Sequence, residues 1–244
     1  MSTPRTAGTT NSTGKPTIWY LSLRSPYSWL AIRLAQKRWP ELWADAELRV
    51  FFEPGEAMAT EVAERRIDFP YVAMSRAKHL YILRDVRRIA GGLGLTPTWP
   101  VERDPQWDVP SLAVVAALRA DAVSGRELAL DLTAARWERG EDILDRAVVA
   151  DSARRAGLDP ALADAVDDPQ VRAWGGEALE QVQRHGVFGV PMIVVGREPY
   201  WGVDRLPLAA AAHEKAEPPP VEDYLGSAVR EPDLGGGDHA GGCG

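Results

Sequence analysis

The segment Thr17–Leu30 constrains the fold more than any other, because it joins a strand pattern directly to a helix pattern. Apolar, β-favouring residues fill positions 18–23, and apolar residues at helical spacing follow. Between them, Ser25 is a good helix N-cap residue and Pro26 suits the first helical position, where no backbone N–H is needed. We therefore predict a strand that leads into a helix over about residues 26–38.

The start of this helix is also the first candidate site. The free backbone N–H groups and the helix dipole favour an anion there, and a thiolate is one such anion. A helix that is merely well capped by Ser25 accounts for the same residues. The rest of the chain has to distinguish between these two interpretations.

Length and composition narrow the class of protein. A chain of 244 residues, 45% hydrophobic, can bury a sizeable core in one large or two small domains. Its net charge of −7 argues against a nucleic-acid-binding protein, and no apolar run approaches the roughly 20 residues of a membrane span. The single cysteine, Cys243, permits no internal disulfide and favours the cytoplasm.

The chain after the first helix alternates between β and helical patterns. Residues 47–52 form a second strand pattern, and a strand–helix–strand order predicts parallel pairing through a right-handed crossover. Residues 53–68 are predicted to be a loop with a little helix. Further helices are then predicted at about 75–90, 111–122, 126–137, 143–156, 160–165 and 170–184, with an irregular Pro-rich loop over 93–110.

The β pattern returns near the C-terminus. An apolar run over 187–195 and a return strand at 199–201 predict a β-hairpin. A last helix is predicted over 204–212, N-capped by Asp204. This order predicts an α/β, thioredoxin-like fold (β-α-β … β-β-α) with a large helical insertion. We divide the chain into disordered tails at 1–15 and 213–244, a thioredoxin-like domain at 16–52 and 186–212, and a helical insertion at 53–185.

The redox motif of such folds is missing. Redox members of the thioredoxin superfamily place Cys-x-x-Cys at the N-terminus of the first helix. The corresponding residues here are Ser25-Pro26-Tyr27-Ser28. A disulfide oxidoreductase is therefore rejected, and Ser28, one helical turn after Ser25, is expected to be structural.

Three segments stand out in the sequence, in the order Ser25–Leu30, Gly186–Pro191 and Trp201–Leu206. Together they resemble the family of 2-hydroxychromene-2-carboxylate isomerase and kappa-class glutathione transferase, a DsbA-like branch of the thioredoxin superfamily. Residues 77–85 and 140–143 are also similar to segments of this family. The resemblance implies an enzyme that uses glutathione. It also implies a homodimer.

The resemblance further implies the role of individual residues. Ser25 matches the serine that donates a hydrogen bond to the glutathione sulfur. Val190 and Pro191 match the cis-proline loop, whose backbone pairs with the cysteinyl part of the thiol. The residues that contact the γ-glutamyl group of glutathione in the family match the backbone of Val203 and the side chain of Asp204. Asp204 also suits the N-cap position of a helix.

Lys78 matches a lysine near the glycyl end of glutathione, but a solvated helix charge is an equal alternative. Asp85 and Arg88 are interpreted as structural. The chain lacks the family's asparagine in the segment 65–70 and differs in the loop 104–109, so the thiol could be glutathione or another small thiol.

The function that these residues imply is thiol-dependent isomerisation or transfer, in which a thiolate held at Ser25 adds to a conjugated or aromatic small molecule. A thiol-independent biosynthetic isomerase or cyclase and a non-catalytic thioredoxin-fold binding protein are the alternatives. The four histidines have no metal-ligand spacing, so no metal site is predicted. No role is assigned to Cys243 beyond that of a tail residue.

Overall fold

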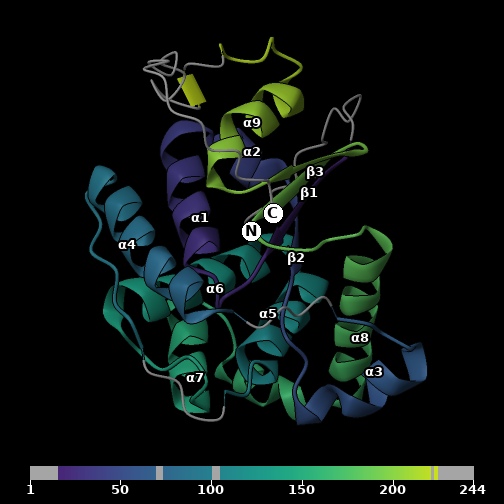
Figure 1. The fold of residues 1–244 in the computed structure, drawn as a ribbon. Helices are drawn as coiled ribbons and strands as arrows, with labels where there is room; N and C mark the ends of the chain where they lie inside the picture. The colour runs from purple at the N-terminus through teal and green to yellow at the C-terminus, as the bar shows by residue number, and fades with distance from the viewer. Residues whose placement is uncertain (1–15, 70–73, 101–104, 221–222, 225–244) are drawn as a thin grey trace, which may run out of the picture.

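The computed structural model describes residues 16–69, 74–100, 105–220 and 223–224. Its centre is a four-stranded sheet, surrounded by helices (Figure 1). The sheet order is β2-β1-β3-β4, in which β1 pairs in parallel with β2 and antiparallel with β3, and β3 pairs antiparallel with β4. The strands are β1 (Thr17–Leu21), β2 (Glu47–Val50), β3 (Met192–Val195) and β4 (Glu198–Trp201). The predicted parallel pairing of the first two strands and the predicted hairpin are confirmed.

The helices also follow the predicted order. The first two are α1 (Pro26–Arg38) and α2 (Pro40–Asp45). The insertion contains η1 (Glu56–Met58), α3 (Ala59–Arg65), α4 (Arg76–Gly92), α5 (Asp108–Ala120), α6 (Ala122–Ala134), η2 (Ala135–Arg139), α7 (Arg146–Arg155), η3 (Pro160–Asp167) and α8 (Pro169–Arg184). The chain ends with η4 (Val203–Arg205) and α9 (Leu206–Glu214). Most of both predicted tails lies outside the described residues.

The structure refines the predicted helices at three places. Pro40 begins α2, a short helix that the sequence analysis did not include. The segment predicted as a loop with a little helix contains α3, and Asp108 to Pro110, assigned to a loop, belong to α5. Proline is compatible with the first turn of a helix, so these prolines did not mark the boundaries that we expected.

One hydrophobic core joins the sheet to the insertion. Alternate residues of β1 point to opposite faces, and the face of Trp19 and Leu21 packs in the same cluster as Leu112 of α5 and Leu128 of α6. The other face carries Tyr20, which packs with residues at and after the end of α8. In Figure 1 the insertion helices lie below and to both sides of the sheet, whereas α2 and α9 lie above it. The thioredoxin-like part and the insertion share this core, so the division between them follows only the order of the elements along the chain. We keep this division as a proposal.

The end of α6 widens into a π-helical turn, η2, where the sequence predicted continuous helix to Trp137. Glu138 of this turn accepts hydrogen bonds from Trp29 Nε1 (2.7 Å) and from Arg33 Nε (2.6 Å), both on α1. Thr98 bonds the turn from the other side, donating from Oγ1 to the carbonyl oxygen of Arg136 (2.6 Å). The turn is thus held against the helix that begins at Ser25.

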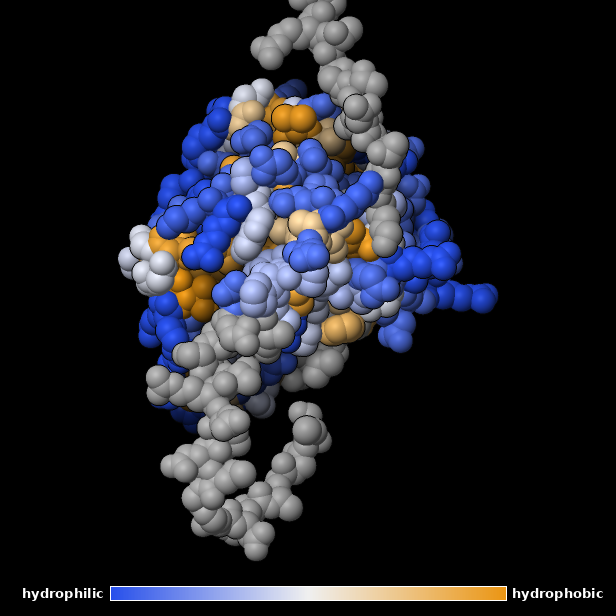
Figure 2. Space-filling view, turned by 90° about the horizontal axis from the view of Figure 1, so that it is seen from above, coloured by the Kyte–Doolittle hydropathy of each residue, from blue (hydrophilic) through white to orange (hydrophobic). Residues whose placement is uncertain are grey.

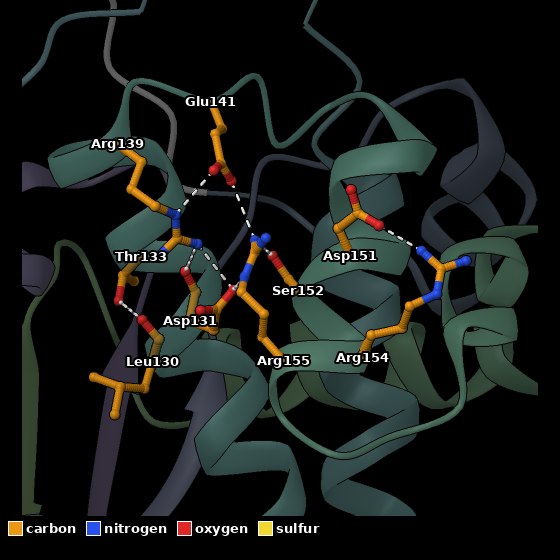
Figure 3. Close-up of polar contacts among 9 residues, drawn as sticks. All are labelled: Leu130, Asp131, Thr133, Arg139, Glu141, Asp151, Ser152, Arg154 and Arg155. Atoms are coloured by element: carbon orange, nitrogen blue, oxygen red, sulfur yellow. Dashed lines mark hydrogen bonds and ion pairs between the residues drawn. The ribbon is translucent and has the colours of Figure 1, made fainter.

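A ring of ion pairs holds the outer end of the π turn (Figure 3). Arg139 pairs with Asp131 (2.9 Å) and Glu141 (3.0 Å), and Arg155 of α7 pairs with the same two carboxylates at 3.0 and 3.2 Å. Each pair is partly exposed and contributes little alone, but the closed ring ties α6, η2 and α7 together. Within the described residues, no helix combines the length and apolarity that crossing a bilayer requires.

The packing of α5 on α6 predicts opposite effects for two Gly→Ala substitutions. A Cβ on Gly125 would lie 2.4 Å from the backbone nitrogen of Leu118, whereas a Cβ on Gly91 of α4 has nothing within 4 Å. We expect Gly125→Ala to lower the free energy of unfolding by about 1–3 kcal/mol, and Gly91→Ala to raise it by up to about 1 kcal/mol. Urea unfolding of both variants measures this, and equal stability of the two would contradict the packing.

Candidate functional site

Two adjoining cavities lie at the N-terminal end of α1. The first, of about 570 Å³, is lined by Ser25, Lys78 and Val190 among others. The second, of about 520 Å³, is lined by Val190, Pro191, Val203 and Asp204. Tyr27, Val190 and Trp201 line both and form the boundary between them. The structure thus places every site residue expected from the sequence on one of two neighbouring cavities.

Ser25 stands at the start of α1 with its backbone in the extended region, and its Oγ accepts a hydrogen bond from the backbone N–H of Ser28 (3.2 Å). Because Ser25 Oγ is the acceptor in this bond, its hydroxyl proton can be donated to another group. Ser28 is fully buried and its Oγ accepts from the backbone N–H of Ser22 (3.2 Å). Ser28 therefore fastens the helix to the end of β1, as predicted.

The loop before β3 faces this helix. The Val190–Pro191 peptide bond is cis, as the sequence predicted. The carbonyl oxygen of Pro191 accepts from the backbone N–H of Gly202 (3.0 Å), which joins the loop to the end of β4. A Cβ on Gly189 would lie 2.8 Å from Trp201 Nε1, so a larger residue would require the indole at the cavity boundary to shift.

Asp204 does not cap the last helix, and that prediction is wrong. The N-cap position of α9 is Arg205, with no side-chain cap bond, and Asp204 lies in the preceding 3₁₀ turn. Its carboxylate pairs with Arg205 Nη1 (2.7 Å) and lies over Gly202, where a Cβ would approach Oδ1 to 2.7 Å. Gly202 also has a φ of +101°, which L side chains rarely adopt. Asp204 therefore remains on the exposed rim of the second cavity.

Helix α4 forms a wall of both cavities with two neighbouring stripes of side chains. Lys78, His79, Ile82 and Leu83 line the first cavity. Tyr81, Asp85 and Ile89, four residues apart, line the second. Residues about one helical turn apart lie on the same side of a helix, so each stripe faces a single cavity. Lys78 is exposed at the edge of the first cavity.

Asp85 and Tyr27 are site residues to which the sequence analysis assigned no ligand role. Tyr27 donates its hydroxyl proton to Asp85 Oδ2 (2.8 Å), and Asp85 also pairs with Arg88 (2.7 Å). Burial, and then the hydrogen bond to Asp85, raise the pKa of Tyr27 far above its ordinary value, so this hydroxyl stays protonated. The pair links the start of α1 to α4. Only the helical spacing of residues 81, 85 and 89 hinted at this cavity wall.

The far wall of the first cavity is aromatic and cationic. The Arg136 guanidinium, on the π turn, lies 4.9 Å from the ring centre of Trp107 and 4.8 Å from that of Trp137. Trp99 meets Trp137 edge-on at 5.6 Å. These residues lie far from Ser25 in sequence, and the helical pattern over 126–137 carried no sign of a π turn.

The two cavities differ in charge. Arg24, Lys78 and Arg136 line the first, and no carboxylate does so among the described residues. Asp85 and Asp204 line the second, with Arg205 beside them. Three or more His, Cys, Asp or Glu side chains arranged to hold a metal are not found in the described part of the chain. The site therefore suits a ligand with an anionic and a cationic end.

Apolar side chains are exposed around the cavity mouths. Four of the six large hydrophobic residues that are exposed in the described structure line a cavity: Met74, Tyr81, Phe188 and Trp201. Phe188 and Trp201 meet edge-to-face at 5.0 Å. Figure 2 shows a mostly hydrophilic face with orange groups at its top, near its centre and on its left, and the left is the side on which α4 lies in Figure 1. The site is thus open to solvent through an apolar rim.

The loop that carries Val190 is anchored at its start by a histidine. Tyr20, on the second face of β1, bonds through its hydroxyl to His185 Nδ1 (2.7 Å), and Arg49 Nη1 donates to the same hydroxyl (3.2 Å). The hydroxyl of Tyr20 therefore links Arg49 of β2 to the residue that follows α8. Burial and the positive charges of Arg49 and Arg184 lower the pKa of His185, partly offset by Glu47.

Comparison with known proteins agrees with this geometry. The family model described as a DSBA-like thioredoxin domain matches residues 18–213. The sequence matches no curated protein. Among solved structures, a 2-hydroxychromene-2-carboxylate isomerase is similar with a TM-score of 0.60 and 21% identity, over 82% of this chain and 94% of that one.

Two redox proteins are also similar in structure. A probable DsbA oxidoreductase from Streptomyces coelicolor has a TM-score of 0.58 and 17% identity, over 85% of this chain and 92% of that one. The cytosolic disulfide reductase DsbM from Pseudomonas aeruginosa, solved with GSH, has a TM-score of 0.50 and 19% identity, over 75% and 87%. At these identities the likeness concerns the fold.

The lowered pKa of His185 predicts how stability depends on pH. The unfolded chain takes up a proton at this residue near the ordinary imidazole pKa of 6.5, whereas the folded chain resists it, so stability is lost as pH falls below about 6.5. In His185→Gln, which can still accept from Tyr20, we expect a smaller loss between pH 8 and pH 5.5. Urea midpoints at the two pH values measure this, and parallel losses in both proteins would refute it.

Proposed function

Because the chain belongs to the DsbA-like thioredoxin family, we propose that it is an enzyme that has exchanged disulfide chemistry for thiolate chemistry: a thiol-dependent isomerase or transferase, similar to 2-hydroxychromene-2-carboxylate isomerase. The observation that carries the proposal is the position of Ser25. It caps α1 at the edge of a large cavity, next to Val190 of the cis-proline loop. A serine pair cannot form the disulfide of a redox enzyme.

The proposed role of Ser25 is to hold a thiolate. Its hydroxyl proton, which the bond from Ser28 leaves available, donates to the sulfur, and the helix N-terminus adds partial positive charge. Both favour the ionised form, so the thiol pKa falls toward neutral pH. The bound sulfur is then nucleophilic without a base to deprotonate it.

The charges of the two cavities support glutathione, or a related small thiol, as the cofactor. Asp204 suits the ammonium of the γ-glutamyl group, and the backbone at Val203 its carboxylate. The backbone of Val190 and Pro191 pairs with the cysteinyl part between them. Lys78, on the cationic first cavity, suits the glycyl carboxylate. That DsbM is solved with GSH agrees with this choice.

The rest of the first cavity takes the acceptor. Trp99, Trp137 and Phe188 give it flat apolar walls, which suit an aromatic or conjugated small molecule. The sulfur forms a bond to an electrophilic carbon of this molecule. In an isomerase the adduct rotates about the former double bond and expels the thiol, whereas in a transferase it is released. We further propose a homodimer in the cytoplasm.

A screen of small thiols tests the proposal. Thiolate absorbance at 240 nm is titrated for glutathione, cysteine and coenzyme A, with and without protein. We expect the pKa of at least one thiol to fall by about 1–2 units on binding, and the fall to disappear in Ser25→Ala. Asp145→Ala, which removes a comparable N-cap from α7 far from the cavities, should leave the fall intact.

The result also separates the alternatives. If no thiol shows a shift, the role of Ser25 is wrong. Catalysis that persists after all thiols are removed would then indicate a thiol-independent isomerase or cyclase. An inert protein would indicate a binding role.

Asp204 provides an independent prediction about which part of the thiol the second cavity holds. We expect Asp204→Asn to weaken glutathione about three- to tenfold, the loss of one exposed charge-assisted hydrogen bond. Glutaryl-cysteinyl-glycine differs from glutathione only in lacking the ammonium, so the substitution should not weaken it. Calorimetry with both peptides measures this. Equal losses for the two would place the ammonium elsewhere.

A further inference from the structure

The addition of a thiolate to a conjugated carbonyl compound leaves a charge that the site described so far does not neutralise. When the C–S bond forms, the electrons of the C=C bond move toward the carbonyl oxygen and give an enolate. The enolate must accept a proton for the adduct to be stable, and must return it when the thiol is expelled. This need arises from the proposed function, and the inference rests on it.

Few side chains that line the first cavity can transfer a proton near neutral pH. Tyr27 already donates its hydroxyl to Asp85, and its pKa is strongly raised. Arg24 and Arg136 are guanidinium groups, which stay protonated. Hydroxyls such as that of Ser22 are far weaker acids. His79 carries the one imidazole among the described lining residues.

The backbone of His79 is fixed in the first turn of α4. Its backbone N–H donates to the carbonyl oxygen of the N-cap residue Ser75 (2.9 Å), and Ser75 Oγ accepts from the N–H of Lys78 (3.2 Å). His79 lies one turn before Leu83 on the stripe that faces the first cavity. Its ring is exposed to solvent, so it can exchange protons with water. The charged groups around this cavity are Arg24, Lys78 and Arg136.

We propose that His79 is the proton-transfer residue of the thiol addition. Its imidazolium gives a proton to the enolate as the C–S bond forms, and the imidazole regains one from solvent, which received the proton of the thiol. The sum is thiol plus acceptor to adduct, with no oxidant or reductant. In the reverse direction the imidazole removes the same proton while the C–S bond breaks.

Two probe acceptors separate proton transfer from every other role of His79. Addition of glutathione to 4-phenylbut-3-en-2-one requires protonation of an enolate. Displacement of chloride from 1-chloro-2,4-dinitrobenzene forms a C–S bond with no proton added to carbon. In His79→Ala we expect the enone rate to fall about a hundredfold, the lower range for general acid–base catalysis. The chloride displacement should stay within twofold, and added imidazole should restore part of the enone rate.

The control is His213→Gln, because His213 bonds to Thr17 and lines neither cavity. It should change neither reaction. Equal falls of both rates in His79→Ala would overturn the proposal, since they indicate a role in shaping the site. An unchanged enone rate would overturn it too, as would a wild-type protein that catalyses chloride displacement but not enone addition.

The failure of the underlying function has a different pattern. If glutathione binds at Ser25 and chloride displacement depends on that residue, while His79→Ala leaves enone addition unchanged, only the role of His79 is wrong. If Ser25→Ala changes neither thiol binding nor either rate, the thiolate site and the proton-transfer role both fail.

Discussion

The antiparallel pairing of β1 with β3 is the contact on which the candidate site depends. It sets Tyr20 opposite Met192, so the end of β1, which leads to Ser25, lies next to the start of β3, which Val190 and Pro191 precede. About 165 residues of sequence separate the two segments, and the sheet register alone decides which atoms meet. The parallel partner β2 then completes the crossover that places α1 on one face. Neither Ser25 nor the cis-proline loop would form a site without this register.

The insertion contributes through one irregular turn and one helix, both fixed to α1. Glu138 binds Trp29 and Arg33 from the π turn, and Asp85 binds Tyr27 from α4. A regular helix beyond Ala134 would rotate the side chains that follow, including Arg136, away from their present direction. The ion-pair ring in Figure 3 stabilises the outer end of the same turn. The shape of the first cavity and the position of Ser25 are thus linked through direct contacts, although they depend on different parts of the chain.

Features that depend on neighbouring residues were predicted well from the sequence, whereas features that depend on contacts between distant residues were not. Ser25 and Pro26 act through their own backbone, so the start of α1 could be predicted from neighbouring residues. Asp204 shows the opposite case. Aspartate is a common N-cap residue, but here the chain turns at Gly202 and forms a 3₁₀ turn before α9 begins. The contact of Asp85 with Tyr27 could not be predicted, because the two residues are 58 positions apart in the sequence. The π turn at Arg136 follows from packing against α1, which no local pattern records.

The replacement of two cysteines by serine changes more than redox chemistry. In a Cys-x-x-Cys enzyme the nucleophile is covalently part of the chain, and the helix N-terminus needs only to stabilise it. In the function that we propose for Ser25, the nucleophile arrives on a separate molecule, which has to be recognised at both ends to place its sulfur correctly. This requirement gives a reason for the second cavity and for the opposite charges of the two. The cationic first cavity with its aromatic walls is then free to hold the acceptor beside the same sulfur. A site in which a thiolate adds to a conjugated carbonyl compound also needs a proton donor, because the enolate that the addition forms must be protonated.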